Sequence, residues 1–209
     1  MFGEDFLMRA LLWGPVILLS LTVHEFAHAW SAHKFGDDTA KNMGRLTFNP
    51  LAHLDMMGTI VMVVSQFTFG WAKPVPVNIA NLRNPRVADI WISAAGPISN
   101  LGMAIIAGLL YQTMGQPGAT EGGAAYFTEI LRGGVFINLA LAAFNMIPIF
   151  PLDGSHILGN LLPRRYQASY ERFNQYAPFL LIIIVITGVF WAVVGPVVAT
   201  VASVLLGHF

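Results

Sequence analysis

Long apolar runs with few charges are the feature that most restricts the fold of this chain of 209 residues. The strongest runs cover residues 6–32, 90–114, 135–151 and 177–206. A helix needs about 20 apolar residues to cross the hydrocarbon core of a bilayer, so each run is long enough or nearly long enough to span. Because the chain is 56% hydrophobic and only 11% charged, it is far more apolar than a soluble domain. The sequence therefore predicts an all-α polytopic membrane protein with four to six transmembrane helices.

The last apolar run leaves its helix count open. It contains Gly195-Pro196, so it fits either one tilted, kinked helix or two short helices. Neither a repeat nor a low-complexity stretch interrupts the sequence. We expect a single domain over residues 1–209, with its core at about 7–160 and its C-terminal membrane helix or helices at about 177–206.

A fifth apolar run, residues 60–69, is short and rich in Val, Thr and Phe. It leads into Gly70-Trp71-Ala72-Lys73-Pro74-Val75-Pro76-Val77-Asn78. Its length and its β-branched residues favour strands over a spanning helix. We therefore expect a membrane-associated β-hairpin between the first and second core helices. Its free edge could pair with an extended substrate by strand addition.

The distribution of Lys and Arg favours one topology, because these residues prefer the cytoplasmic side of a membrane. If residues 60–69 span, the 11 basic residues divide seven against four. If this run dips into the membrane and returns, they divide nine against two. We therefore predict a multi-pass protein of the cell membrane with an extracytoplasmic N-terminus and a cytoplasmic connection over residues 34–89.

The charge balance and the absence of cysteine exclude several classes of protein. Lys plus Arg equals Asp plus Glu, at 11 each, so no basic surface for nucleic acid is indicated. With no cysteine, disulfides, thiolate ligands and a Cys nucleophile are all excluded. Any bound metal must be held by His, Asp or Glu.

The first apolar run contains the motif His24-Glu25-Phe26-Ala27-His28. On a helix the two imidazoles lie on one face, where they can chelate one metal ion. A catalytic zinc site accepts two imidazoles and a carboxylate and keeps one position for water, whose proton Glu25 can take. Chance polar residues on a helix that faces a bundle are the alternative. Charged groups in a bilayer helix cost roughly 2–3 kcal/mol each, which favours a functional site.

Asp153 is the candidate for a third ligand, because it closes the run 135–151. His24 precedes Lys34 by ten residues, or about 15 Å of helix, which predicts a site near the cytoplasmic face. In the topology with the returning segment, the first helix and the helix at 135–151 run in the same direction, so His28 and Asp153 can meet. Pro-Leu-Asp-Gly is also good turn chemistry, and a turn is the alternative for Asp153.

The pairing of H-E-x-x-H in one membrane helix with Pro-Leu-Asp-Gly in a later one resembles the site-2 protease family of intramembrane zinc metalloproteases. Gly70–Asn78 is similar to the β-hairpin segment of that family, and Ala95-Gly96-Pro97-Ile98-Ser99-Asn100 is similar to the start of its next core helix. The resemblance runs from about residue 15 to 160. The resemblance is to the compact members of the family, since the sequence has no room for a PDZ or CBS domain.

The resemblance implies that His24, His28 and Asp153 hold Zn²⁺ and that Glu25 is the general base and acid. The implied activity is hydrolysis of peptide bonds within or near transmembrane segments of membrane-embedded or membrane-anchored proteins. Asn100 and Asn145 could donate hydrogen bonds to a substrate carbonyl or oxyanion, although hydrogen bonds between helices fit them equally well.

A non-proteolytic metal-binding scaffold or transporter is the competing function, because buried His and Asp also serve metal and proton transport. The intact Glu25 argues against it. The sequence assigns no role to His53, Asp55 or His156, and it leaves the oligomeric state open.

Overall fold

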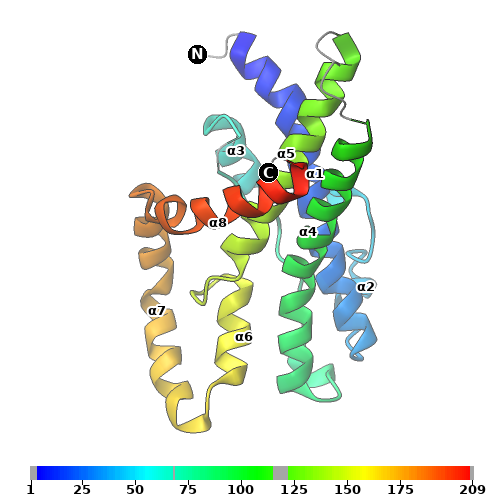
Figure 1. Ribbon diagram of the computed structural model, residues 1–209. Coiled ribbons are helices and arrows are strands. Elements are labelled where there is room, and N and C mark those ends of the chain that lie inside the picture. The colour runs from blue at the N-terminus through cyan, green and yellow to red at the C-terminus, as the bar shows by residue number, and fades with distance from the viewer. Residues whose placement is uncertain (1–3, 68, 115–121, 208–209) are drawn as a thin grey trace.

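The computed structural model describes residues 4–67, 69–114 and 122–207. The chain forms a bundle of helices (Figure 1), and two short 3₁₀ helices, Pro50–Ala52 and Ile79–Asn81, lie between them. The α-helices are α1 (Glu4–Lys34), α2 (Thr39–Asn42), α3 (Met56–Val64), α4 (Pro85–Met114), α5 (Gly122–Asn145), α6 (Asp153–Leu161), α7 (Arg164–Ile186) and α8 (Val189–Leu206). Among the described residues, α1, α4, α5 and α8 are long and apolar enough to cross a membrane. The prediction of a helical, multi-pass membrane protein is confirmed.

Helices α1, α4 and α5 pack together and form the centre of the bundle. Gly133 of α5 allows a close approach to α1, because a β-carbon there would overlap the ring of Trp13. Helix α8 crosses α4 and α5 at a steep angle (Figure 1). Ala104, Val135, Leu139 and Val198 are among the buried side chains that join these three helices.

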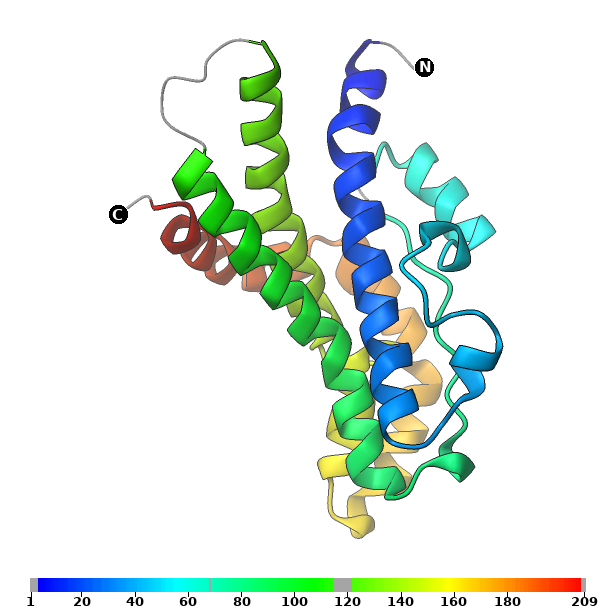
Figure 2. The ribbon, with the colours of Figure 1, turned by 90° about the vertical axis from the view of Figure 1, so that its right-hand side faces the viewer.

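The segment between α1 and α4 turns back on itself. At its base the amide of Arg83 donates a hydrogen bond of 3.2 Å to the carbonyl of Phe35. At its far end the ring of Phe67 lies 5.8 Å from the ring of Phe6 in the first turns of α1. Figure 2 shows this segment running along α1 in both directions. It therefore enters the bundle beside α1 and leaves where it began.

The predicted β-hairpin is wrong. Residues 56–64 form helix α3, and the part of the chain that the structure describes contains no strand, only an isolated antiparallel bridge between Leu54 and Ala72. Asp55 caps the helix, since its side chain accepts a hydrogen bond of 2.8 Å from the amide of Gly58. A helix satisfies its own backbone hydrogen bonds, as apolar surroundings require, whereas a lone hairpin leaves edge groups unpaired. The β-branched residues therefore did not decide the backbone.

Buried polar side chains hold the returning chain in place. Arg45 donates hydrogen bonds of 2.5 Å to the carbonyl of Lys73 and 3.1 Å to that of Pro74. His53 is buried, and its Nε2 donates to the carbonyl of Thr47 at 2.8 Å. The sequence assigned no role to His53 or Asp55. In the structure His53 holds the returning chain, and Asp55 caps helix α3.

Two helices, α7 and α8, form the last apolar run, and they are separated at Thr187 and Gly188. Gly188 has a φ of +71°, a backbone conformation that glycine adopts most easily. Pro196 lies inside α8, and the helix continues through it. Of the two alternatives for this run, the structure has two helices, with the break before Gly195-Pro196.

Candidate metal centre

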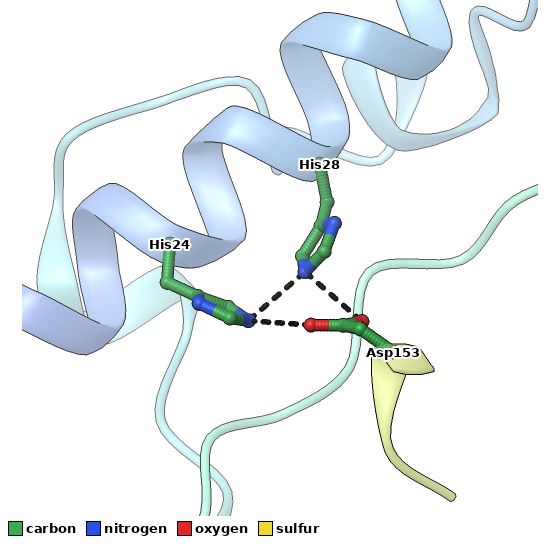
Figure 3. Close-up of side chains that lie close together, drawn as sticks. All are labelled: His24, His28 and Asp153. Carbon is green, nitrogen blue, oxygen red and sulfur yellow. Dashed lines mark hydrogen bonds and ion pairs between the residues drawn. The ribbon is translucent and has the colours of Figure 1, made fainter. Parts of the chain in front are cut away.

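His24 and His28 lie on the face of α1 that points into the bundle. Their exposed fractions are 5% and 8%, so both side chains are buried inside the bundle. The Nε2 atoms of the two rings are 3.0 Å apart. Figure 3 shows both rings directed at one point, as the i, i+4 spacing predicts.

Asp153 reaches the same point from α6, where it is the first helical residue. Its Oδ2 lies 3.3 Å from His24 Nε2, and its Oδ1 lies 3.4 Å from His28 Nε2 (Figure 3). One candidate ligand atom from each of the three residues lies within 4.8 Å of the others. The structure thus brings together the three residues selected from the sequence. Their role as metal ligands remains a prediction.

A close approach between helices explains why Gly154 follows Asp153. A β-carbon at Gly154 would overlap the carbonyl oxygens of Met146 and Ile147, which follow the end of α5. Any other residue would push α6 away from α5. The Asp-Gly pair therefore sets the position of the carboxylate relative to α1.

The outer nitrogens of both histidines bind helix α4. His28 Nδ1 donates to the carbonyl of Ile92 at 2.7 Å, and His24 Nδ1 lies 2.6 Å from Asn100 Oδ1. With a proton on each Nδ1, both neutral rings direct the lone pair of Nε2 towards Asp153. Such outer hydrogen bonds are typical of histidines that bind metals.

These groups fit a divalent cation. Two lone pairs and a carboxylate face one another, and the buried Oδ2 of Asp153 accepts no hydrogen bond from the described residues. A β-carbon at Gly96 of α4 would lie 2.5 Å from His24 Cε1 and 2.6 Å from His24 Nε2, so glycine keeps this space open. Two imidazoles and one carboxylate suit zinc and leave a coordination position for water.

Glu25 lies beside these residues and is 8% exposed. It is close enough to interact electrostatically with His28 and with Arg45. Within the described chain, no hydrogen bond to its carboxylate is found. A buried carboxylate without a hydrogen-bonding partner can accept a proton from water.

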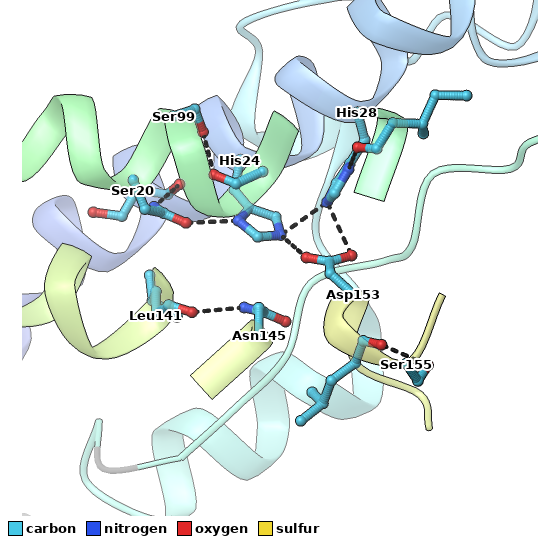
Figure 4. A network of polar contacts seen from close by, with 12 residues as sticks. Ser20, His24, His28, Ser99, Leu141, Asn145, Asp153 and Ser155 are labelled. Carbon is cyan, nitrogen blue, oxygen red and sulfur yellow. Dashed lines mark hydrogen bonds and ion pairs between the residues drawn. The ribbon is translucent and has the colours of Figure 1, made fainter. Parts of the chain in front are cut away.

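The two candidate asparagines have different surroundings, and Figure 4 shows those of Asn145. Asn100 is fully buried, and its Nδ2 donates to Asn138 Oδ1 at 2.8 Å while its Oδ1 faces His24. Asn145 is only partly buried, and its Nδ2 donates to the carbonyl of Leu141 at 3.0 Å. Asn145 is thus the more accessible amide. Sequence reasoning missed Asn138, whose only signal was an amide inside an apolar helix.

A polar cavity of about 420 Å³ lies along α6 and α7. Ser155, His156 and Tyr170 are among its lining residues, and Ser155 is two residues from Asp153. His156 Nδ1 lies 3.5 Å from Asp89 Oδ2 on α4. His156, unassigned from the sequence, therefore lines a polar space next to the candidate metal centre.

Comparisons with known proteins identify relatives of this chain. The family model described as peptidase family M50 matches residues 119–188. The protein named "Putative zinc metalloprotease YwhC" from Bacillus subtilis is 41% identical over 174 residues, which cover 82% of this chain and 78% of that protein. No solved structure matches the chain.

More distant relatives have similar names. "Putative zinc metalloprotease Rip2" from Mycolicibacterium smegmatis is 28% identical over 81% of this chain and 64% of its own length. "Zinc metalloprotease MJ0392" from Methanocaldococcus jannaschii is 25% identical over 78% of this chain and 39% of its own length. Given the identity to YwhC over most of both chains and the match to the family model, this chain belongs to peptidase family M50, the site-2 protease family.

Proposed function

We propose that this chain is an intramembrane zinc metalloprotease that hydrolyses peptide bonds within or near the transmembrane segments of other proteins. The observation that carries the proposal is the meeting of His24, His28 and Asp153 beside Glu25, with both histidines and Glu25 on α1, a helix long and apolar enough to cross a membrane. Membership of peptidase family M50 supports the same reaction.

His24, His28 and Asp153 would hold the zinc ion, and Glu25 would manage the proton. When bound, zinc supplies Lewis acidity, which polarises a carbonyl and acidifies water. Glu25 takes one proton from water as the oxygen of that water bonds to the scissile carbonyl carbon. It then gives that proton to the leaving nitrogen as the C–N bond breaks. The products are a carboxyl group and an amine.

Asn145 is the residue that we assign to the substrate carbonyl. Its side chain is partly exposed near Asp153 (Figure 4), and one N–H already bonds Leu141. The second N–H of the amide can donate to the carbonyl oxygen as negative charge develops on it. A substrate helix must unwind locally first, because its own hydrogen bonds cover its carbonyls.

We propose that the metal centre lies near the cytoplasmic face and that the N-terminus is extracytoplasmic. The count of basic residues, nine against two, supports this orientation. In the continuous helix α1, His24 lies about 15 Å from Lys34 along the axis. The polar cavity next to Asp153 would then give water a path from the cytoplasm.

We also propose that residues 1–209 act as one intramembrane domain. The contact of α8 with α4 and α5, through buried side chains such as Val198 and Ala104, supports this view. The C-terminal helix thereby packs on α4 and α5, the two helices that also pack against α1.

Cleavage of a fluorogenic transmembrane substrate by the purified full chain tests the function. We expect cleavage that stops with a zinc chelator and returns when zinc is added. Metal binding without cleavage of any membrane-spanning substrate would instead fit a metal-binding scaffold or transporter. A chain free of transition metal after purification, and unable to take up zinc, would refute the proposal.

A further inference from the structure

We propose that Asn138 is a positioning residue for the metal centre: through Asn100 it fixes which ring nitrogen of His24 carries the proton. Asn138 lies on α5, Asn100 on α4 and His24 on α1, so this chain of hydrogen bonds crosses three helices. The inference rests on the proposed zinc site.

The direction of each hydrogen bond in the row from Asn138 to His24 is set by a backbone carbonyl, that of Gly134. Asn138 Nδ2 donates to the carbonyl of Gly134 at 2.8 Å, and a carbonyl can only accept. The other end of the Asn138 amide is therefore its oxygen, which accepts from Asn100 Nδ2 at 2.8 Å. Because the NH₂ group of Asn100 points at Asn138, the oxygen of the Asn100 amide faces His24 Nδ1 at 2.6 Å.

That order leaves one tautomer for the neutral ring of His24. Since Asn100 Oδ1 can only accept, His24 Nδ1 must carry the proton. Nε2 is then unprotonated and directs its lone pair at the point shared with His28 and Asp153. A turned Asn100 amide would offer N–H to Nδ1 and move the proton to Nε2, the nitrogen that must bind the metal.

Burial makes this arrangement effective. Asn100 and Asn138 are 0% and 1% exposed, so water does not offer competing hydrogen bonds. The carbonyl of Ser20 lies 3.4 Å from Asn100 Nδ2, a longer contact that supports the same orientation. His28 needs no such chain, because its Nδ1 donates directly to the carbonyl of Ile92.

Zinc affinity of the detergent-purified full chain, measured by competition with a chromophoric chelator, tests the inference without relying on proteolysis. Asn138→Leu keeps the number of heavy atoms and the branching of the side chain but removes the acceptor for Asn100. We expect its zinc affinity to fall about 10- to 100-fold, the usual effect of losing an outer partner of a metal ligand. Asn138→Asp should bind zinc like the wild type, because a buried carboxyl group stays protonated, donates its O–H to the carbonyl of Gly134 and offers its other oxygen to Asn100.

A second substitution separates the tautomer from simple packing. In Asn100→Asp, a carboxylate faces His24 Nδ1 and accepts a hydrogen bond from its N–H whichever way the carboxylate turns. In that background Asn138→Leu should cause no further loss of zinc affinity. If Asn138 acted only in helix packing, its loss would weaken zinc binding in both backgrounds alike.

Thr22→Val is the matched control. Thr22 is also buried in α1 and donates to the carbonyl of Leu18 at 2.6 Å, but it has no place in the chain of amides. Its zinc affinity should equal that of the wild type. If Asn138→Leu does not elute as a folded protein, Asn138→Asp and the double variant decide.

Two results would overturn the inference: folded Asn138→Leu with wild-type zinc affinity, or folded Asn138→Asp with a tenfold loss. A wild-type chain that binds no zinc would refute the proposed function itself, which is a different outcome.

Discussion

The amide of Arg83 donates a hydrogen bond of 3.2 Å to the carbonyl of Phe35, so the end of α1 and the start of α4 are fixed side by side. The two helices consequently run in opposite directions from one point. This arrangement places Ile92, Gly96 and Asn100 of α4 opposite the histidines of α1. The base of the returning segment thus sets the alignment on which the candidate metal centre depends.

Asp37 should make this base sensitive to acid. It is fully buried, and burial raises its pKa, but hydrogen bonds from Thr39, Asn81 and Asn78 lower the pKa below its ordinary 3.8. A depressed pKa contributes stability that is present above the ordinary value and lost as the pH falls through the folded-state value. We expect protease cleavage within residues 35–84 to rise as the pH falls below 3.8.

Asp37→Asn should lower the stability of the purified protein by about 1–3 kcal/mol, since an NH₂ group would face N–H donors in a buried site. Thermal unfolding measures this loss. Asp38→Asn is the control, because Asp38 is half-exposed and pairs with His33 and Lys41 near the surface. Equal losses in the two variants would contradict the assignment.

Glu25→Gln should bind zinc normally and lose at least about 100-fold in cleavage rate, because an amide cannot take the proton of water. Elemental analysis and initial rates on a transmembrane substrate measure the two effects. Glu129→Gln removes an exposed carboxylate that lies 3.3 Å from Arg132, and it should leave both values unchanged. A Glu25→Gln enzyme with the wild-type rate would disprove the proposed base.

Gly96→Ala should abolish zinc binding, because the added methyl group would occupy the space between α4 and the two imidazoles. Gly102→Ala on the same helix is the control, since no atom lies within 4 Å of its β-carbon position. Alanine is a better helix former than glycine, so the control should be as stable as the wild type or more so. Stoichiometric zinc in Gly96→Ala would show that the space is not needed.

The orientation in the membrane can be tested with reporter fusions. A fusion after Gln116, which lies outside the described residues, should report an extracytoplasmic position. A fusion after Leu162, which follows α6, should report a cytoplasmic one. The reverse pattern would overturn the orientation while leaving the metal centre intact.

Much of the geometry of the candidate metal centre could be predicted, because it is local or follows from helix direction. The i, i+4 spacing of His24 and His28 fixes their common face on any helix. Asp153 was expected to meet them because two membrane helices that run the same way bring its carboxylate to a similar depth. Neither step needs knowledge of side-chain packing.

The remaining features depend on contacts that no local pattern encodes. The β-branched residues of 60–69 suggested strands, but Asp55 caps a helix there, and apolar surroundings favour one. Helix α5 begins at Gly122, well before the apolar run at 135–151, and Glu129 and Arg132 pair with each other in this earlier part. The role of Asn138 depends on the register of three helices against one another.

Gly96 also limits how the enzyme can move. Its neighbours Ala95 and Pro97 both carry a β-carbon, so sliding or rotating α4 by one residue would drive carbon into the imidazoles. The α1–α4 pair is therefore a stationary frame. We therefore expect any opening that admits a substrate to come from helices other than α1 and α4.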